Sequence, residues 1–496
     1  MATNLGLGNF VKRIQNIMRQ DAGVSGDAQR IEQLTWMLFL KAYDDREQEW
    51  EALDPSYQSI IPEPFRWHNW ALTGVTEDGR IGDELRNFID NELFPALQSL
   101  PITPETPRRK SVVRDVFQEV HNYMKDGSLI FEVAKTLNEI DFTDPVQTKN
   151  FGNVYEAILH DLQSAGNAGE YYTPRILTNF MAEHVDLKLG DRVADLACGT
   201  AGFLVSAMNV LRRQAKTNED RDQIDNRTIY GVEKKPLPYL LACTNLILEG
   251  IVNPNIDHRN SLINDLDNSP FEQKELADVI LMNPPYGGTE KTTIQNNFPA
   301  DLKSSETADL FLVLMMERLK TNGRAAVIVP DGLLFGTGNK TEIKKKLLRE
   351  FNLHTVVRLP EGIFAPYTSI RTNILFFDRT RPTEQTWFYR VDTPEGVERF
   401  SKTRPATKES LAGLEKWWDD RKPITKDGAD KARLYTAKEI EANGFNLDLC
   451  SYAKPEEDTR TPEEILDDYC EEWRKCRSEA DAAFAEIRKV LAQGGN

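Results

Sequence analysis

Apolar positions recur every three or four residues through most of the first 150 residues. In the stretch AQRIEQLTWMLFLKAYDDREQEWE, Ile31, Leu34 and Leu38 fall on one side of a helix. Similar spacing follows in IGDELRNFIDNELFPAL and SVVRDVFQEVHNYM, with prolines between the segments. The pattern predicts a helical N-terminal domain over residues 1–150, in which no residue indicates chemistry.

From residue 151 to about residue 390, short apolar runs alternate with helical patterns. Six runs predict strands, namely RVADLAC, TIYGVE, ADVILMN, RAAVIVP, TVVRLP and TNILFFD. Strands of nearly continuous Val, Ile and Leu, separated by helices such as PLPYLLACTNLILEG, are typical of a parallel sheet covered on both faces. The sequence therefore predicts an α/β domain with a Rossmann-like parallel sheet flanked by helices. Ligands of such sheets bind beyond the carboxyl ends of the strands.

The pattern changes twice after residue 390. Residues 391–455 are mixed and polar, and residues 456–496 predict one long helix that begins at a Thr461–Glu464 capping box. Its apolar side chains then alternate four and three apart, at Tyr469, Trp473, Cys476, Ala480, Ala483 and Ile487. Such a seam is typical of a helix that packs on another helix. A partner's helix and the chain's own N-terminal bundle fit the seam equally well.

Charge bears on the kind of partner. The net charge is −17, although basic residues cluster at 108–110 and 344–346. A protein that holds DNA by itself usually has a basic face. If nucleic acid is the substrate, a partner is therefore expected to supply much of the phosphate contact. Acidity that simply keeps a protein soluble accounts for the charge equally well.

Composition excludes several classes of protein. The five cysteines are scattered without a C-x-x-C pair and the six histidines form no cluster, so neither a disulfide framework nor a zinc site is expected. No apolar run is long enough to span a membrane, and the N-terminal stretch lacks the apolar core of a secretory signal. We therefore expect a cytoplasmic protein that makes no membrane contact and binds no metal.

Two polar features follow neighbouring predicted strands. In DRVADLACGTAGFL, Asp195 ends a strand, and Gly199 and Gly202 would let a ligand approach the backbone. The G-x-G-x-x-G spacing is absent, so a tight turn without a ligand remains an alternative. Glu233 ends the next strand, where a carboxylate can accept hydrogen bonds from both hydroxyls of a ribose. By itself, an ordinary surface glutamate would explain it as well.

The run ADVILMNPPYGG ends a buried strand in an amide, two prolines and an aromatic ring. The exocyclic amine of a base is a poor nucleophile because its lone pair is delocalised. The Asn283 side-chain oxygen and the Pro284 carbonyl could accept both of its N–H groups, while Pro284 and Pro285 hold the backbone rigid. Tyr286 offers a face for a base rotated out of its helix. A plain strand-to-loop turn is the alternative.

Together these motifs resemble the amino-group DNA methyltransferases that use S-adenosylmethionine. More closely, the chain resembles the modification subunit of type I restriction–modification systems, over nearly all of its length. Further matching stretches are LTWMLFLKAYDD in the helical domain, GEYYTPR before the glycine turn, and LPEGIFAPYTSIRTNILFF and GFNLDLCSY after it. The resemblance implies a helical N-terminal domain (1–150), a catalytic domain (151–390), a polar extension (391–455) and a C-terminal helix for subunit contact (456–496).

The resemblance also implies roles for individual residues. Asn283, Pro284, Pro285 and Tyr286 would hold the target adenine. Residues implied to bind S-adenosylmethionine are Glu170, Tyr171, Tyr172, Thr173, Pro174, Asp195, Ala197, Gly199, Thr200, Gly202, Phe203, Glu233 and Asn260. Two positions depart from the family pattern. Asn260 stands where relatives often carry Asp, yet Asn can still accept a hydrogen bond. Ala201 stands where Gly is common, and we expect little effect if its φ is negative.

The resemblance implies transfer of a methyl group to the N6 amine of adenine in DNA without a metal. It also implies several partners: a specificity subunit that reads the DNA, a second copy of the modification subunit, and a restriction subunit that performs ATP-driven translocation and cleavage. GTGNKT at 336–341 does not satisfy the phosphate-loop pattern. Alternatives are a protein glutamine methyltransferase, which also uses Asn-Pro-Pro-Tyr, a cofactor-binding scaffold without activity, and a cytosine-N4 methyltransferase.

Overall fold

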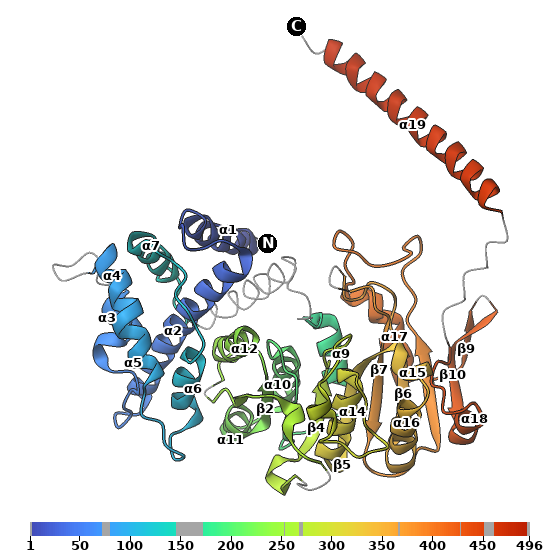
Figure 1. The fold of residues 1–496 in the computed structure, drawn as a ribbon, viewed down its shortest axis with the longest axis horizontal. Coiled ribbons are helices and arrows are strands. Elements are labelled where there is room, and N and C mark those ends of the chain that lie inside the picture. Colours follow the sequence, from blue (N-terminus) through green and yellow to red (C-terminus); the bar gives the residue numbers. More distant parts are fainter. Residues whose placement is uncertain are drawn as a thin grey trace. The chain divides into compact units, whose positions relative to one another are not determined.

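The computed structural model divides the chain into two compact units, residues 1–451 and residues 452–496 (Figure 1). The residues it describes are 2–71, 80–144, 172–251, 253–266, 271–365, 368–426, 428–450 and 461–493.

The N-terminal part of the first unit is helical, as predicted (Figure 1). Its α-helices are α1 (Ala2–Met18), α2 (Asp27–Leu53), α3 (Trp67–Trp70), α4 (Asp83–Phe88), α5 (Phe94–Gln98), α6 (Arg108–Phe117) and α7 (Gly127–Leu137). The face of α2 predicted from Ile31, Leu34 and Leu38 is buried at 3% exposure or less. A short π-helical turn, Ile89–Leu93, joins α4 to α5, so the run IGDELRNFIDNELFPAL forms one nearly continuous helical stretch.

Ten strands of the first unit form one sheet in the order β3-β2-β1-β4-β5-β7-β6-β8-β10-β9. They are β1 (Val193–Asp195), β2 (Ile229–Glu233), β3 (Ile256–His258), β4 (Ala277–Met282), β5 (Leu319–Pro330), β6 (Asn352–Arg358), β7 (Thr372–Asp378), β8 (Gln385–Arg390), β9 (Ile424–Lys426) and β10 (Ala429–Thr436). Along this order, the first five strands, β3, β2, β1, β4 and β5, pair in parallel, as predicted. The rest of the sheet is mixed: β7 runs antiparallel to both neighbours, and β10 runs antiparallel to β8 and β9. Residues 391–455 thus contribute two strands to this sheet.

Side chains that alternate along the strands build one core on each face of the sheet. Val193 and Val279 belong to one core, and Ala194 and Ile280 belong to the other. Helices α9 (Arg175–His184), α10 (Gly202–Gln214), α12 (Pro236–Leu248) and α17 (Ala412–Asp419) supply side chains to the first core. Helices α14 (Thr307–Arg318), α15 (Asp331–Phe335), α16 (Asn339–Glu350) and α18 (Ala437–Ala442) supply side chains to the second. The described residues of this unit also form α11 (Asn218–Gln223) and α13 (Thr292–Gln295).

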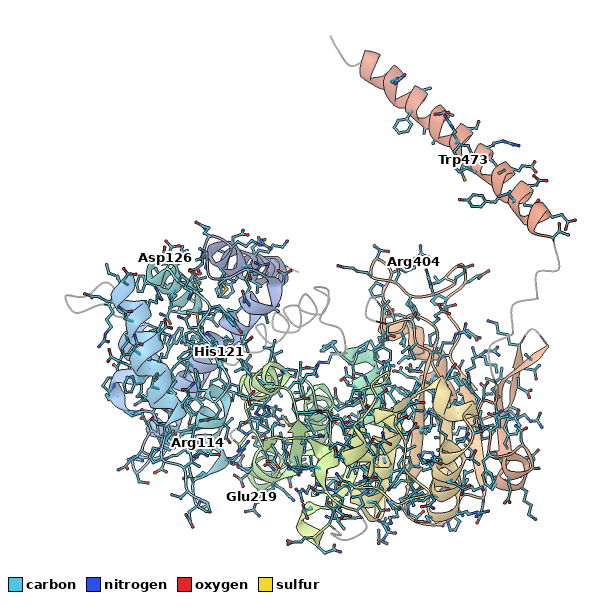
Figure 2. The ribbon with its side chains drawn as sticks, in the orientation of Figure 1. Arg114, His121, Asp126, Glu219, Arg404 and Trp473 are labelled. Atoms are coloured by element: carbon cyan, nitrogen blue, oxygen red, sulfur yellow. The ribbon has the colours of Figure 1, made fainter. Side chains whose placement is uncertain are left out.

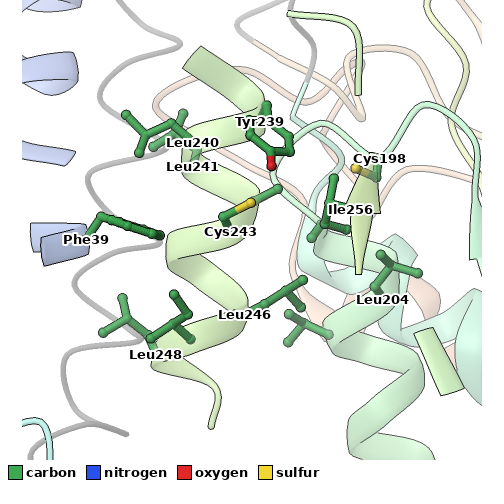
Figure 3. Packing of buried hydrophobic residues seen from close by; sticks show 14 of the residues in the cluster. Phe39, Cys198, Leu204, Tyr239, Leu240, Leu241, Cys243, Leu246, Leu248 and Ile256 are labelled. Carbon is green, nitrogen blue, oxygen red and sulfur yellow. The ribbon is translucent and has the colours of Figure 1, made fainter. Parts of the chain in front are cut away.

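Helix α12 lies between the sheet and the N-terminal helices. Figure 3 shows Phe39 of α2 pointing toward one side of α12, while Tyr239 and Cys243 lie on the side nearer Ile256 of β3. Arg108 at the start of α6 adds polar contacts: its guanidinium donates to the carbonyl of Ile256 and, at 3.1 Å, to the hydroxyl of Tyr239. The helical part and the sheet therefore share one continuous core.

The described residues of the second unit form the helix α19 (Pro462–Gln493), in the stretch where the sequence predicts it. The predicted capping box is present: the Glu464 carboxylate accepts the N–H of Thr461 at 2.7 Å, and the Thr461 hydroxyl accepts the N–H of Glu464 at 3.3 Å. Several large apolar side chains of α19 are exposed, among them Tyr469 and Trp473 (Figure 2). None of the helices in the described residues has the length and apolar character that crossing a membrane requires.

Candidate functional site

A cavity of about 580 Å³ lies at the carboxyl ends of β1, β2 and β4. β1 pairs in parallel with both β2 and β4, so the segments that follow these three strands emerge at the same edge of the sheet. The register aligns Ala194 with Ile280, which brings the turn after Asp195 beside the Asn283–Tyr286 segment. The cavity is thus walled by the motifs that the sequence singled out, and its volume lies within the ~300–1,000 Å³ of ordinary ligand sites.

The glycine turn forms one wall and is held from two sides. The N–H of Cys198 donates to the carbonyl of Val232 at 3.0 Å, and the side chain of Asn245 on α12 donates to the carbonyl of Thr200 at 2.8 Å. Gly199 has a φ of +52°, and a Cβ added there would meet no atom within 4 Å. A Cβ added at Gly202 would meet the side chains of Thr178 and Arg175 at 3.7 and 3.8 Å. At Gly199, no side chain therefore separates the backbone from the cavity.

The condition attached to Ala201 in the sequence analysis is not met. Ala201 has a φ of +63°, so the position does not keep the negative φ under which alanine would replace glycine without effect. The N–H of Ala201 donates to the carbonyl of Cys198 at 2.7 Å. Ala201 is fully buried and is the N-cap residue of α10. The left-handed region brings an L side chain close to the following carbonyl, at a cost of roughly 1–2 kcal/mol.

We expect Ala201→Val to destabilise the catalytic unit by about 2 kcal/mol, because a β-branched side chain is disfavoured at positive φ and the position is fully buried. Ala201→Gly serves as the control and should stay within about 1 kcal/mol of the parent, since relief of strain opposes the greater freedom of the unfolded chain. Denaturant unfolding of the two variants and the parent measures the difference. A valine variant as stable as the parent would contradict the strained geometry.

Glu233 closes the same wall from the end of β2. Its Oε2 accepts the N–H of Gly199 at 2.9 Å, and its Oε1 accepts the N–H groups of Lys234 and Lys235, both at 2.8 Å. Three backbone donors therefore fix the carboxylate against the glycine turn. The Glu233 carboxylate also lines the cavity, and a carboxylate is an acceptor for the donor groups of a ligand.

Asp195 lies deeper, with 1% of its surface exposed. Its Oδ1 accepts the N–H of Ala197 at 3.1 Å. Burial raises the pKa of Asp195 to about 8, and the negative charge of Glu233 adds to the rise, while the Ala197 hydrogen bond opposes it. In the free chain this carboxyl group is therefore protonated at mildly acidic pH.

This pKa predicts how stability depends on pH. Because the folded-state pKa lies above the ordinary value of 3.8, the folded chain binds more protons than the unfolded chain between about pH 4 and about pH 8. The free energy of unfolding contributed by this group should fall as pH rises through that window, by at most about 1.4 kcal/mol per pH unit. Denaturant unfolding of the cofactor-free chain at several pH values, compared with Asp195→Asn, measures this slope. An identical slope in both proteins would contradict the shifted pKa.

Residues around β3 complete the half of the cavity formed by the glycine turn. Asn260 lines the cavity, and its Oδ1 accepts the N–H of Leu262 at 3.1 Å, which leaves one acceptor position on that oxygen. The hydroxyl of Ser261 donates to the carbonyl of Leu196 at 2.6 Å and so joins this segment to the glycine turn.

The Asn283–Tyr286 segment forms the other half. The amide Nδ2 of Asn283 donates to the hydroxyl of Thr173 at 3.0 Å. Its Oδ1 is buried, and no donor in the described part of the chain reaches it. A buried carbonyl oxygen without a partner costs about 1–3 kcal/mol, so this atom is prepared to accept a hydrogen bond from a group that enters the cavity.

Tyr286 also lines the cavity, although only 5% of its surface is exposed. Its ring meets the ring of Phe364 edge to face, with centroids 6.2 Å apart and planes at 74°. Pro284 is buried and Pro285 is exposed, and both line the cavity. Phe364 thus holds the tyrosine ring in the wall.

Nearly all of the residues singled out from sequence line this cavity. They are Tyr172, Thr173, Asp195, Ala197, Gly199, Thr200, Gly202, Phe203, Glu233, Asn260, Asn283, Pro284, Pro285 and Tyr286. Glu170 and Tyr171 lie outside the described residues, and Pro174 is the N-cap of α9. The sequence analysis missed several lining residues, including Lys234, Leu237, Arg259, Glu290 and Ile370. Lys234 and Leu237 adjoin Glu233 in sequence, but Ile370 carries no signal that would have pointed to it.

The two basic clusters are engaged within the fold. The Arg108 guanidinium pairs with Asp115 at 2.6 Å. The guanidinium of Arg109 lies 5.2 Å from the centre of the Tyr57 ring, and the ammonium of Lys110 lies 4.7 Å from it. In the second cluster the ammonium of Lys344 is buried and donates to the carbonyls of Leu334 and Gly336, at 2.7 and 2.8 Å. This burial lowers the pKa of Lys344 to about 8.

The neighbours of Lys344 are paired with carboxylates. Lys345 pairs with Glu342 at 2.8 Å, and Lys346 pairs with Glu350 at 2.8 Å and with Glu317 at 3.2 Å. Both clusters therefore serve contacts inside the chain. Among the described residues, no group of three or more His, Cys, Asp or Glu side chains is arranged to hold a metal ion, and the expectation that methyl transfer needs none stays a prediction.

Comparison with known proteins gives two family matches. Residues 146–461 match the family described as N-6 DNA Methylase, and residues 7–137 match the HsdM N-terminal domain. The two matches cover most of the chain.

Individual relatives agree with these families. The methylase subunit of the type I restriction enzyme EcoEI from Escherichia coli is 46% identical over 94% of each chain. The EcoKI methylase subunit from Escherichia coli K12 is 29% identical, over 92% of this chain and 82% of its own. The crystal structure of a modification subunit from Vibrio vulnificus YJ016 has 42% identity and a TM-score of 0.79, covering 89% of this chain and 94% of that one. A chain from a study of complex assembly in the type I R-M system has 34% identity and a TM-score of 0.78, covering 99% of both.

Proposed function

This chain belongs to the N-6 DNA methylase family as a modification subunit of a type I restriction–modification enzyme, and from that premise we propose that its cavity holds S-adenosylmethionine beside an adenine rotated out of DNA. The chain is thus an adenine-specific DNA methyltransferase. The observation that carries the proposal is the side-chain oxygen of Asn283, which is buried in the cavity wall without a donor from the described residues.

The half of the cavity at the glycine turn fits the cofactor. The bare backbone at Gly199 leaves room for a ligand against the turn, and the Glu233 carboxylate is held where it can accept hydrogen bonds from ribose hydroxyls. The remaining residues proposed to contact the cofactor are Tyr172, Thr173, Pro174, Asp195, Ala197, Thr200, Gly202, Phe203 and Asn260, together with Glu170 and Tyr171. When bound, S-adenosylmethionine supplies an electrophilic methyl group.

The Asn283–Tyr286 half is proposed to hold the adenine. The N6 amine has two N–H groups, which Asn283 Oδ1 and the Pro284 carbonyl each accept. These contacts aim the nitrogen lone pair and stabilise the positive charge that grows on the amine as the new bond forms. Tyr286 offers its ring to the base, and such stacking contributes roughly 1–3 kcal/mol.

The chain accelerates the transfer mainly by holding the two reacting atoms in line. Asn283 accepts hydrogen bonds and forms no covalent bond. Cys198 takes no part as a nucleophile, since burial holds the pKa of its thiol well above the ordinary value. As the nitrogen bonds to the methyl carbon, the carbon–sulfur bond would break with its electron pair left on sulfur, and the amine would then release one proton to water.

DNA recognition is proposed to lie with partners. The chain is acidic overall, at −17, and its two basic clusters are engaged internally. Helix α19 exposes Leu466, Tyr469, Trp473 and Phe484, each more than half exposed. An apolar helix face of this kind suits packing against a helix of a specificity subunit. A second copy of this subunit and a restriction subunit complete the proposed assembly.

The alternatives drawn from sequence are disfavoured by the relatives. The 46% identical protein is a methylase subunit of a restriction enzyme over nearly its whole length, which favours neither a protein glutamine methyltransferase nor an inactive scaffold. The match to the N-6 DNA methylase family favours adenine over the N4 amine of cytosine.

The test is to supply labelled S-adenosylmethionine and DNA from an unmethylated host to the purified chain, with and without its co-expressed specificity partner. Label recovered as N6-methyladenine only in the presence of the partner supports both the chemistry and delegated recognition. Label in DNA without the partner would contradict delegated recognition. Label in protein alone, or no label, would contradict the assignment of Asn283–Tyr286. Sequencing the methylated sites also yields the target sequence.

A further inference from the structure

Residues 399–408 include four basic residues and no acidic one, although the chain has a net charge of −17. Three of the four, Arg399, Lys402 and Arg404, are exposed and lie within residues 399–404, which we call the basic loop. Figure 2 shows Arg404 on this loop, which extends beyond the sheet. The two basic clusters described above are, by contrast, engaged within the fold.

Carboxylates of the chain hardly compete for the cations of the basic loop. Among the described residues, none forms an ion pair with Lys402 or Arg404. The guanidinium of Arg399 lies 3.8 Å from the carboxylate of Glu361, and the Arg399 side chain remains 68% exposed. Exposed ion pairs are weak, because water and salt screen them. The loop therefore presents positive charge that contacts within the chain leave available.

The backbone of the basic loop is fixed at its base. Phe400 is 4% exposed, and its N–H donates to the carbonyl of Glu361 at 3.2 Å. Ser401 and Arg404 then close a tight turn, in which the N–H of each donates to the carbonyl of the other, at 3.0 and 3.1 Å. Lys402 lies at the tip of this turn. Because the backbone is already ordered, binding a partner costs the loop less conformational entropy.

The basic loop emerges at the same edge of the sheet as the cavity. It follows β8, which runs parallel to β6, while β7 runs antiparallel to both β6 and β5. The carboxyl ends of β8, β6 and β5 therefore lie at one edge. β4 is parallel to β5 and ends at the same edge, immediately before Asn283.

Close contacts connect the basic loop to the cavity wall. A Cβ added at Gly362 would lie 2.2 Å from the carbonyl oxygen of Phe400, so the two backbones are packed together. Two residues after Gly362, the ring of Phe364 packs against Tyr286, which lines the cavity. Two residues span at most about 7 Å, and DNA carries a phosphate about every 3.4 Å along each strand. The loop thus lies a few phosphates from the mouth of the cavity.

We propose that the basic loop binds phosphates of the DNA strand beside the target adenine, through Arg399, Lys402 and Arg404. The proposal rests on the proposed function, because it takes the adenine to enter the cavity. An enzyme that rotates a base out of the duplex must supply the free energy of unstacking it. Contacts to the neighbouring phosphates fix the register of the strand and carry no sequence information, so the specificity partner still reads the target sequence.

The test uses the chain in its complex with the specificity partner, on DNA that contains the methylated sequence. Lys402→Gln combined with Arg404→Gln removes two charges, whereas Lys402→Arg combined with Arg404→Lys keeps them. Arg381→Gln combined with Lys438→Gln is the matched control. Both control residues are exposed and lie near the amino end of β8, at the opposite edge of the sheet.

The first measurement is the dependence of DNA affinity on salt concentration. Each phosphate contact contributes about 0.9 to the slope of log affinity against log salt, so the glutamine pair should reduce the slope by about 1–2. Its affinity at 0.1 M salt should fall by about 10- to 60-fold, because each contact contributes up to about eightfold relative to 1 M salt. The charge-conserving pair and the control pair should keep the parent's slope. Calorimetric affinity for S-adenosylmethionine should equal the parent's in all variants, which shows that the cavity is intact.

The second measurement locates the phosphates. Uncharged methylphosphonate linkages replace single phosphates along the strand that carries the target adenine. In the parent complex, replacements within a few nucleotides of the adenine should weaken binding. The same replacements should have little further effect in the glutamine pair, because changes to the two partners of one contact are not additive.

Three results would overturn the proposal. One is a glutamine pair that keeps the parent's salt slope, and another is a methylphosphonate pattern that the glutamine pair leaves unchanged. The third is a glutamine pair that separates from the specificity partner on size-exclusion chromatography, which would assign the basic loop to a protein contact. The proposed function, by contrast, fails if the parent complex forms no N6-methyladenine on the same DNA.

Discussion

Replacing Asn283 by alanine is expected to slow methyl transfer by about 10²–10³-fold, the usual effect of removing one preorganised hydrogen-bonding group that acts on charge developing in the transition state. The variant loses a side-chain acceptor that is buried in the cavity wall and has no donor among the described residues. Binding of S-adenosylmethionine should change little, because Asn283 lies on the opposite half of the cavity from Glu233. Single-turnover formation of N6-methyladenine and calorimetric binding of the cofactor measure the two effects separately.

Asn296→Ala is the matched control. Asn296 is exposed after α13 and accepts only the ammonium of Lys303, at 3.2 Å, so its replacement should leave the rate unchanged. An Asn283→Ala enzyme that methylates adenine at the parent's rate would refute the assignment of the amide to the N6 amine.

Replacing Glu233 by glutamine is expected to weaken binding of S-adenosylmethionine by about 10- to 100-fold, which corresponds to one or two hydrogen bonds to a charged acceptor. The carboxylate accepts N–H groups of Gly199, Lys234 and Lys235, and an amide would turn its NH₂ group toward at least one of these donors. The glycine turn would then lose its fixed position, and the ribose would lose an acceptor. Isothermal titration with S-adenosylmethionine measures the change.

Glu219→Gln provides the control for the loss of one negative charge. Glu219 is exposed on α11 (Figure 2) and does not line the cavity, so the variant's affinity for the cofactor should equal that of the parent. At saturating cofactor, the methylation rate of Glu233→Gln should come within a few-fold of the parent's rate. Unchanged affinity in Glu233→Gln would show that the carboxylate does not contact the cofactor.

Much of the fold was predictable because burial on both faces leaves a strong apolar signal. The six predicted strands all exist, and TNILFFD corresponds to β7 over its full length. Four strands were missed: β3 (IDH) and β9 (ITK) are short and contain polar residues, β10 (ADKARLYT) is largely polar, and β8 (QTWFYR) was also not predicted. The antiparallel direction of β7 was also missed, because strand direction depends on the connections and pairing rather than on side-chain periodicity.

The site was predictable where chemistry is concentrated in a short motif. Gly199, Glu233 and Asn283 each follow a strand, and parallel neighbours bring strand ends together. The backbone angle of Ala201 could not be predicted, since it results from how the turn is held between β1 and α10. Nor could the bond between Thr173 and Asn283, because it joins segments that only the folded chain brings into contact.

The internal engagement of the two basic clusters has a consequence for how the assembled enzyme responds to salt. Proteins gain affinity for DNA by releasing counterions from the phosphates that their lysines and arginines neutralise, so each such contact steepens the fall of affinity with ionic strength. Arg108, Lys345 and Lys346 already neutralise carboxylates of their own chain, and Lys344 is buried. Their participation in counterion release would require breaking these contacts within the chain. We therefore expect the ionic-strength dependence of DNA binding to report mainly on other surfaces of the assembled complex.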